Sequence, residues 1–347
     1  MKEPLVSVIV VNWNGHGVIK DCLNSLIKIH YSNWELLVVD NGSSDKSLEL
    51  LSSLHHSPPR AGFPISNFQL IKNKTNLGFA KANNQGYKMS KGKYILLLNN
   101  DTKVTVDFLG NLVDRMEGDH TIGVIQPKLF ILGKKGYLDN VGSFLTRIGF
   151  MQHIGYMQKD TALFDNEMIT FSAKGACMLI RSNIIKKVGL FDRDFESYFE
   201  ETDFCWRVWL LGYKVLYFPK AFIYHRVGFS SKRQEQTFIF YHSLKNMQMA
   251  MLKNFSIQNV FLIGGTQLIL ISGLAFYYLL KLQFKKSLMI LKAISWNIVN
   301  ITETLKKRQV VQSFRKKTDD ELFKFILKPV DFKNLFSHFA KVEANFK

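Results

Sequence analysis

A run of five apolar residues that passes directly into three polar ones constrains the fold of this chain most strongly. The apolar run is Tyr94–Leu98, and the polar residues after it are Asn99, Asn100 and Asp101. A short apolar run without alternation is typical of a strand buried on both faces of a parallel sheet. Ligands of such sheets bind just past the carboxyl ends of the strands. We therefore expect Asp101 at the mouth of the sheet, where it could meet a hard cation or a phosphate group; the alternative is that Asp101 and Thr102 only cap the next helix.

Three similar apolar runs precede this one, and helical patterns alternate with them. The expected strands cover residues 5–11, 34–39 and 68–72, and helices are expected in residues 16–29 and 43–54 and from residue 76 onward. This alternation predicts an α/β fold with a mostly parallel, doubly wound sheet and right-handed crossovers. Further on, residues 132–170 are glycine-rich and irregular, which predicts a binding loop or lid.

Amide and carboxylate side chains recur where these strands end. They are Asn12, Asn14, Asp40, Asn99, Asn100 and Asp101. Such groups suit the edges of a nucleobase, a ribose and a metal-bound diphosphate, and Asp40 could accept a hydrogen bond from a pyrimidine N–H. Each asparagine alone would be explained as a turn residue, so the functional interpretation depends on their recurrence. The first strand is not followed by GxGxxG, and there is no Walker A motif, which disfavours a dinucleotide site of the usual kind.

A second group of carboxylates opens a helical stretch in the middle of the chain. Glu200, Glu201 and Asp203 lie in the first turn of a helix that we expect to end at Gly212. The three could simply complement the helix dipole. Alternatively, packed carboxylates raise one another's pKa, which suits a general base. Asp203 and Arg207 are also spaced for an ion pair on one helix face.

One histidine adds to the candidate metal site. His225 follows a further expected strand at residues 214–218. A lone histidine is more often structural than a ligand, so His225 becomes a candidate only because Asp101 already suggests a metal.

Seven segments together make the chain resemble family 2 glycosyltransferases with a GT-A fold, of the rhamnosyltransferase-like branch. One such motif would be weak evidence, but all of them occur in order between about Val6 and His225. The segments are Val8–Asn14, Val38–Asp45, Asn76–Gly86, Leu97–Thr102, Gly175–Arg181, Gly189–Asp192 and Phe199–Arg207.

The resemblance implies that a sugar, for which rhamnose is a candidate, is transferred with inversion from a nucleotide-diphosphate donor to an acceptor hydroxyl. A dTDP- or UDP-linked donor is expected. Asp101 and His225 would bind Mg²⁺ or Mn²⁺, and Glu201 would be the catalytic base, with Glu200 and Asp203 beside it. Asn12 and Asp40 would hold the nucleobase. The residues implied around the nucleotide are Val11, Asn12, Asn14, Asp40, Asn76, Gly78, Asn83, Asn99 and Asn100.

Two departures from the family pattern affect these assignments. The DxD position has a single carboxylate, Asp101, so the metal would be held largely through the diphosphate itself. The base position has a glutamate in place of the usual aspartate, which leaves open whether Glu201 or Glu200 reaches the acceptor.

The C-terminal part of the chain has a different pattern. We divide the chain into a catalytic domain at residues 1–230 and a helical region at residues 231–347, which begins with an amphipathic helix over Thr237–Lys253. Ser256–Leu280 carries no charge and is long enough to span a membrane. Residues 281–317 contain ten Lys and Arg residues and one acid, interleaved with apolar residues, which is typical of a basic amphipathic surface binder.

The net charge of +18 suggests an anionic partner, and we expect an anionic membrane surface rather than nucleic acid. A single span would place the basic tail outside, against the positive-inside tendency, so a re-entrant or in-plane anchor at the cytoplasmic face is favoured. The alternative is a soluble helical subdomain with Ser256–Leu280 in its core. The three cysteines lack CxxC spacing, which agrees with a reducing compartment. A lipid-linked glycan is the expected acceptor.

Two other classes of function remain as alternatives. A sugar nucleotidyltransferase of related fold would want a glycine-rich and basic loop after the first strand, and Asn12–Gly15 does not supply one. A non-catalytic membrane-bound scaffold would bind the sugar nucleotide without turning it over.

Overall fold

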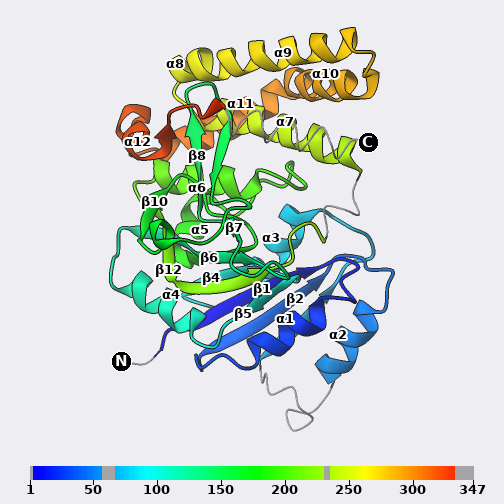
Figure 1. The fold of residues 1–347 in the computed structure, drawn as a ribbon, viewed down its shortest axis with the longest axis vertical. Helices are drawn as coiled ribbons and strands as arrows, with labels where there is room; N and C mark the ends of the chain where they lie inside the picture. The colour runs from blue at the N-terminus through cyan, green and yellow to red at the C-terminus, as the bar shows by residue number, and fades with distance from the viewer. Residues whose placement is uncertain (1–2, 57–66, 230–234, 333–347) are drawn as a thin grey trace.

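A ten-stranded sheet organises the computed structural model, which describes residues 3–56, 67–229 and 235–332 (Figure 1). Its strands lie in the order β10-β12-β6-β11-β4-β1-β2-β3, with β5 beside β12 and β7 beside β6. The strands are β1 (Val6–Asn12), β2 (Trp34–Asp40), β3 (Phe68–Lys72), β4 (Tyr94–Asn99), β5 (Thr102–Val104), β6 (Ile122–Ile131), β7 (Leu138–Asn140), β10 (Met168–Thr170), β11 (Cys177–Arg181) and β12 (Lys214–His225). The predicted domain boundary at residues 230 and 231 and the end of the chain beyond residue 332 lie outside the described residues.

The strands of this sheet do not all run in the same direction. Strands β3, β2, β1 and β4 are parallel, as the sequence predicted. Strand β11 is antiparallel to both β4 and β6, and β10 is antiparallel to β12. The sheet is therefore mixed. It is mostly parallel, as predicted, but its half beyond β4 contains antiparallel strands.

Helices cover both faces of this sheet, as expected for a doubly wound arrangement (Figure 1). Alternate residues of β1 point to opposite sides, so that Val8 packs with one set of helices and Ile9 with the other. The first set is α1 (Ile19–Leu26), α2 (Ser47–His56) and α4 (Phe108–Glu117). The second set is α3 (Phe79–Met89), α5 (Ser182–Val188) and α6 (Glu200–Leu210).

The glycine-rich segment at residues 132–170 is more ordered than its sequence predicts. Besides β7 and β10 it forms β8 (Gly142–Thr146), β9 (Met151–Ile154) and a short 3-10 helix, η1 (Ala162–Phe164). All five residues of β8 are buried, and β8 pairs with β9 and with β13 (Leu327–Lys328) from the far end of the chain. The expectation of an irregular loop was wrong because these short strands pair with their neighbours despite the glycines, β7 with β6 and β8 with β9.

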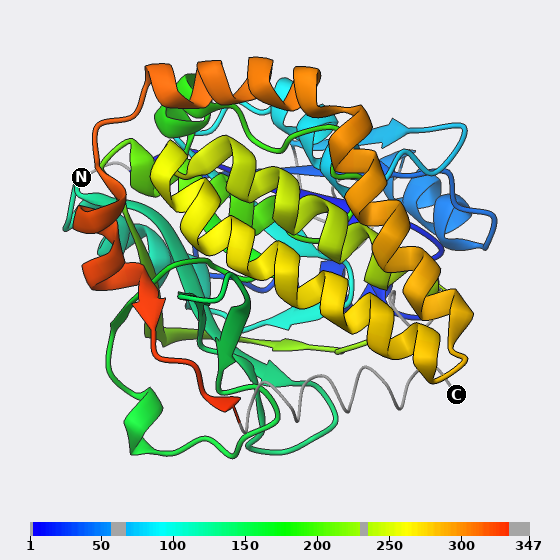
Figure 2. The same ribbon diagram turned by 90° about the horizontal axis from the view of Figure 1, so that it is seen from above.

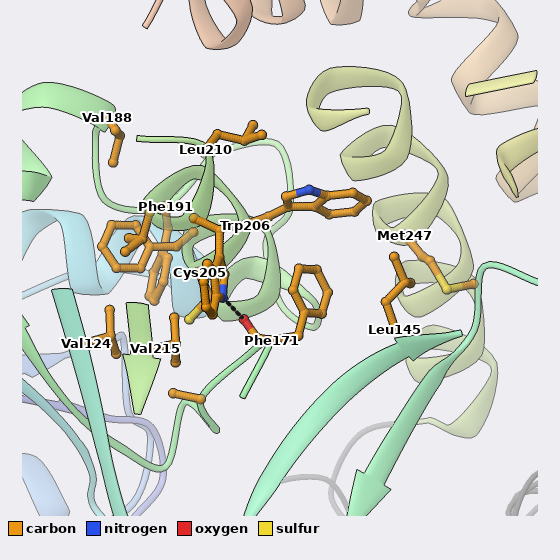
Figure 3. Close-up of a cluster of buried hydrophobic side chains, with 14 of the residues drawn as sticks. Val124, Leu145, Phe171, Val188, Phe191, Cys205, Trp206, Leu210, Val215 and Met247 are labelled. Atoms are coloured by element: carbon orange, nitrogen blue, oxygen red, sulfur yellow. Dashed lines mark hydrogen bonds between the residues drawn. The ribbon is translucent and has the colours of Figure 1, made fainter. Parts of the chain in front are cut away.

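The C-terminal helices extend the core beyond the sheet. They are α7 (Gln236–Asn254), α8 (Ile257–Asn259), the π-helical turn η3 (Val260–Gly264), α9 (Gly265–Leu280), α10 (Phe284–Val299), α11 (Ile301–Ser313) and α12 (Asp319–Ile326). Trp206 of α6 makes the main junction. Its ring lies between α6 and α7 (Figure 3) and meets Phe171 and Phe255 edge to face, at centroid distances of 5.2 and 4.5 Å.

The uncharged stretch near the end of the chain forms an outer layer. Within the described residues, Ile257–Leu280 is the helical stretch long and apolar enough to cross a membrane, and only 22% of its most apolar window is buried. The alternative that this stretch forms the core of a soluble subdomain is therefore not supported, because most of its side chains face outward.

A buried ion-pair network joins α7 to the catalytic part of the chain. The Nζ atom of Lys253, a residue with 2% exposure, lies 2.7 Å from Asp192 Oδ2 and 3.0 Å from Asp203 Oδ1. Lys307 of α11 also pairs with Asp192, at 2.6 Å. Buried charges are tolerated when each has a partner, so removing one member is costly.

We expect Lys253→Met to lower the free energy of unfolding by about 3 kcal/mol, near the lower end for breaking a buried pair, because Asp192 and Asp203 each keep one other cation. The matched control is Lys306→Met. It removes an exposed pair with Glu303, which is worth at most about 1 kcal/mol. Urea unfolding measures the change in free energy of unfolding for both variants. Equal losses would show that the buried network stabilises the protein no more than an exposed ion pair does.

Candidate active site

A cavity of about 380 Å³ opens at the carboxyl ends of β1 and β4. Eight of the residues predicted to form the site line it: Val11, Asn76, Asn99, Asn100, Asp101, Glu200, Glu201 and His225. They come from five separate segments, so the fold brings together side chains more than two hundred positions apart. A second cavity of similar volume lies near α8 and α12, but there Arg315 and Asp319 pair with each other.

Four charged side chains of alternating sign run along one wall of the first cavity. Asp101 Oδ1 lies 3.2 Å from His225 Nε2, and the other ring nitrogen, Nδ1, lies 2.8 Å from Asp139 Oδ2. Asp139 is completely buried, and its other oxygen lies 2.6 Å from Lys174 Nζ. Strand pairing explains the first contact, because β12 ends with His225 opposite Thr102 of β5.

These neighbours shift the pKa values of two members of the row, His225 and Asp139. Burial disfavours the charged imidazolium, but interactions with Asp101 and Asp139 outweigh it and raise the pKa of His225 to about 9. Burial likewise opposes ionisation of Asp139, yet Lys174 and His225 hold the pKa of that carboxyl well below its usual range. The four side chains form a continuous row of three ion pairs, Asp101–His225, His225–Asp139 and Asp139–Lys174.

The residues at this wall fit a divalent cation that is held jointly with a ligand. Asp101 Oδ1 is buried and lacks a hydrogen-bond partner, and an imidazole nitrogen lies beside it. Within the described residues, no group of three or more His, Cys, Asp and Glu side chains is arranged so that it could hold a metal ion. Asp101 and His225 could thus supply two ligands, and oxygens of a bound diphosphate would have to supply others.

A strained turn presents two more carboxylates to the same cavity. Glu196, Tyr198 and Phe199 all have positive φ angles, of 57°, 70° and 72°, which cost energy for residues other than glycine. Asn246 of α7 holds this turn by donating hydrogen bonds to the carbonyls of residues 195, 197 and 198. Helix α6 begins directly after it with Glu200, so the turn aims the start of α6 at the cavity.

Glu200 and Glu201 have different environments although they are adjacent. Burial, followed by the charge of Glu201, raises the pKa of Glu200 well above its usual value. Burial also raises the pKa of Glu201, but backbone amides and the charge of Lys174 counteract it. Of the two carboxyls, Glu201 is thus the one whose ionised form is favoured by a neighbouring cation. The Oε2 atoms of both are buried without a hydrogen-bond partner, so both can accept or donate to a ligand.

Asp203 does not belong to this cavity. Its carboxylate pairs with Arg207 Nε at 3.0 Å, as the i,i+4 spacing predicted, and it also pairs with Lys253. Burial opposes its ionisation, but Lys253 and Arg207 lower its pKa. The expectation that all three acids raise one another's pKa was therefore wrong for Asp203, which the structure assigns to the ion-pair network instead.

Two residues predicted to hold the nucleobase lie behind the cavity wall. Asn12 Nδ2 donates to Asp40 Oδ1 at 2.9 Å, and Asn12 Oδ1 accepts from Asn100 Nδ2 at 2.8 Å. Both Asp40 oxygens also accept from Ser43. Asn12 and Asp40 are thus completely buried and do not line the cavity. Asn100, which does line the cavity, connects Asn12 and Asp40 to it through its hydrogen bond to Asn12.

Three further predicted residues also lie outside the lining. Asn14 accepts a hydrogen bond from the Ser44 amide. Asn83 is buried in α3 and donates to the carbonyl of Phe79. Gly78 has a φ of +84°, and a Cβ there would lie 2.8 Å from the carbonyl oxygen of Glu196, so it allows α3 to approach the strained turn closely.

Several residues of the site were not chosen from the sequence. Trp13, Asn41, Lys174 and Tyr198 line the cavity, and Asp139 lies behind His225. The local signals were that Trp13 and Asn41 lie within the segments Val8–Asn14 and Val38–Asp45 and that Lys174 directly precedes Gly175–Arg181. Asp139 had none, because it lies in the segment expected to be irregular.

Comparison with solved structures defines the class of fold. The GalNAc-T7 structure with UDP, GalNAc and Mn²⁺ has a TM-score of 0.58 at 17% identity and covers 74% of this chain and 49% of that one. Residues 1–349 of Staphylococcus aureus TarS with UDP-GlcNAc have a TM-score of 0.54 at 17% identity, covering 90% and 92%. The mannosyltransferase PcManGT of Pyrobaculum calidifontis, with GDP-Man and Mn²⁺, has a TM-score of 0.53 at 15% identity, covering 86% and 88%. The fold is thus GT-A, as the resemblance implied.

The sequence comparison defines the family. The family model described as glycosyl transferase family 2 matches residues 7–189, which is more than half of the chain. The chain therefore belongs to glycosyl transferase family 2. Poly-beta-1,6-N-acetyl-D-glucosamine synthase of Staphylococcus aureus strain MSSA476 is 24% identical over 216 residues, which cover 62% of this chain and 48% of the relative. The chain thus spans about half the length of this curated relative. The rhamnosyltransferase-like branch stays a prediction.

One hydrogen bond at the cavity floor depends on a glycine, and this allows a structural test. A Cβ on Gly15 would lie 2.1 Å from Asn12 Oδ1 and 2.3 Å from Asn100 Nδ2. We expect Gly15→Ala to lower the free energy of unfolding by about 1–3 kcal/mol, as overpacking does. Gly17→Ala is the matched control, because nothing lies within 4 Å of its Cβ position. Thermal unfolding compares the two, and an equally mild effect at both positions would contradict the geometry.

Proposed function

We propose that this protein transfers a sugar, with inversion, from a nucleotide-diphosphate donor to an acceptor hydroxyl, with the help of Mg²⁺ or Mn²⁺. The observation that carries the proposal is the lining of one cavity. Asp101 and His225 line it together with Glu200 and Glu201. A diphosphate beside the first pair would leave its sugar between the two groups.

Glu201 is the base in this proposal. Its carboxylate takes the proton of the acceptor hydroxyl while the acceptor oxygen bonds to the anomeric carbon. The bond from that carbon to the diphosphate breaks on the opposite face, and this inverts the configuration. The adjacent Glu200, whose pKa is raised by burial and by the charge of Glu201, keeps its proton in this proposal and donates a hydrogen bond. The charge of Lys174, which favours ionised Glu201, supports Glu201 over Glu200 as the base, a choice that the sequence left open.

The charged row supports the leaving group. A divalent cation, when bound, would offset negative charge on the departing diphosphate. Asp101 and His225 would hold it, and Asp139 fixes the orientation of the His225 ring through Nδ1. Lys174 adds a positive charge on the same side of the cavity. The single carboxylate at the DxD position is consistent with this shared support.

The donor is inferred from similar proteins, and the acceptor is inferred from the apolar helices. TarS is described with UDP-GlcNAc, and the curated relative is named for a polymer of N-acetylglucosamine, which favours a UDP-linked sugar. A dTDP-linked donor and rhamnose remain predictions from the sequence. We place the acceptor, a lipid-linked glycan, at the cytoplasmic face of the membrane, because an apolar helical layer adjoins the catalytic part of the chain. A sugar nucleotidyltransferase is disfavoured by the family, and a non-catalytic scaffold is an outcome that the tests below distinguish.

Glu201→Gln should reduce transfer by about 10²–10⁴-fold, the usual contribution of a general base, while donor affinity stays within error. Glu200→Gln is the control. It replaces a protonated acid with a neutral amide of the same shape, so we expect a much smaller loss. Steady-state transfer and calorimetric titration with UDP-sugars measure both quantities. If Glu200→Gln is the more severe change, the roles must be exchanged; if neither variant nor wild type shows turnover despite tight donor binding, the scaffold alternative holds.

The dependence on pH provides a separate measurement on the wild type. Because Glu201 must be ionised to accept a proton and burial raises its pKa above the usual value for a glutamate, kcat/KM should fall as the pH decreases through that raised pKa. Lys174→Met removes a charge that lowers this pKa, so the acidic limb should move to higher pH. If the acidic limb does not move, Lys174 has no effect on the pKa of the base.

Asp101→Asn should weaken Mn²⁺ binding in the presence of UDP and lower transfer, because it removes the only carboxylate of the proposed pair. Electron paramagnetic resonance of Mn²⁺ measures binding without requiring turnover. Asp107→Asn is the control, since Asp107 is exposed and pairs with His30 away from the cavity. Unchanged Mn²⁺ affinity in Asp101→Asn would refute the metal assignment.

A further inference from the structure

Helices α9 and α10 carry their apolar side chains on the outside of the molecule. Phe261 and Ile269 have 73% and 74% of their surface exposed, and Phe276 and Leu280 have 61% and 66%. The exposed large apolar residues on η3, α9 and α10 are Phe261, Leu262, Leu268, Ile269, Leu270, Phe276, Tyr277, Leu279, Leu280, Leu282, Phe284, Leu288, Leu291, Ile298 and Val299. We call this set the apolar face. Soluble proteins rarely expose so many large apolar side chains together, so something covers it.

The inner side of α9 shows the opposite pattern. Its buried residues occur once per turn along the helix and include an amide, Gln267. The stripe is Ile263, Gln267, Ile271, Ala275 and Tyr278. A surface helix in water normally places apolar residues inward and polar ones outward. Helix α9 buries a glutamine and exposes isoleucine and phenylalanine, which indicates that its outer surroundings are apolar.

The stripe also fixes how α9 lies. Helix α9 packs along α10, and the turn η3 before it packs on α7. Figures 1 and 2 show α7, α9 and α10 as one layer across the end of the molecule farthest from α1 and α2. A Cβ on Gly149, in the turn between β8 and β9, would lie 2.7 Å from Gln267 Cβ, so α9 also touches the catalytic part closely. Crossing a bilayer would pull this stripe away from its partners, whereas lying parallel to the surface preserves every contact.

Charge identifies the kind of surface. The chain contains no aspartate or glutamate between Glu235 and Glu303 but six lysines. Lys281 and Lys285 lie exposed at the junction of α9 and α10, and Lys292 lies exposed further along α10. Aromatic side chains, Tyr277 and Phe284, flank the junction. Apolar residues bordered by lysines and aromatic rings are typical of the boundary between acyl chains and anionic headgroups.

We infer that the apolar face docks on an anionic lipid bilayer, with α9 and α10 parallel to the membrane plane. Catalysis is not required for this docking. It deepens the membrane location in the proposed function, and its tests measure binding, so the two can fail separately.

Flotation of the full chain with lipid vesicles tests the docking. The protein should float with vesicles of phosphatidylcholine mixed with phosphatidylglycerol and bind less to phosphatidylcholine alone. Lys281→Gln and Lys285→Gln should each weaken binding to the mixed vesicles about fivefold. Ile269→Ser should weaken binding to both kinds of vesicle about tenfold. Leu163→Ser is the matched control, because Leu163 is equally apolar and 84% exposed but lies on η1, outside the apolar face.

Nucleotide binding separates this result from misfolding. Ile269→Ser should bind UDP as wild type does, because Ile269 is remote from the cavity lining. Absence of vesicle binding by the wild type, or equal binding by Ile269→Ser, would overturn the inference. If the wild type instead forms a dimer on size exclusion and Ile269→Ser is monomeric, a second copy of the chain covers the face.

Depth measurements distinguish the in-plane arrangement from a span. The native cysteines are buried, so single cysteines introduced as Leu262→Cys, Ile269→Cys and Leu280→Cys can be labelled selectively with a fluorophore. An in-plane α9 predicts that lipids brominated at one depth quench all three labels equally, while a Leu163→Cys label stays in water. Stronger burial of the central label than of the two end labels would indicate a span and contradict the arrangement.

Discussion

Burial of charge inside helix α6 is the constraint on which the rest of the structure depends. Apart from Glu201, every residue of α6 is buried, and these include the ionised Asp203 and Arg207. Buried charges require partners of opposite sign. Asp203 has Arg207 as one partner and Lys253 of α7 as the other. The C-terminal helices are therefore held to the catalytic part by electrostatics as well as by the contact of Trp206 with Phe255. The start of α6, with Glu200 and Glu201, is positioned as a consequence.

This arrangement connects the two ends of the molecule. Helix α7 contributes Lys253 to the network and Asn246 to the strained turn before α6. The same helix packs against α10, whose outer side belongs to the apolar face. A bilayer at that face and a donor in the cavity would thus be joined by one rigid helix. For a transferase acting on a lipid-linked acceptor, this gives the cavity a defined orientation toward the membrane.

Local patterns predicted the elements whose environment is uniform. The runs at residues 34–39 and 94–98 are strands because both of their faces are buried, and their polar ends meet because parallel strands end at one edge. The residues whose role depends on distant partners were not predictable. Asp139 meets His225 across 86 positions, and Asp203 meets Lys253 across 50. Arg207, four residues further on, distinguishes Asp203 from Glu200 and could be paired with it from the sequence, whereas the second cation, Lys253, could not.

A structure of the complex with UDP and Mn²⁺ would test the central claim most directly. The account predicts that Mn²⁺ contacts Asp101 and His225, that the diphosphate lies beside it in the cavity, and that the Glu201 carboxylate faces the space beyond the β-phosphate. A nucleotide bound elsewhere, or a terminal phosphate directed away from Glu201, would contradict the account.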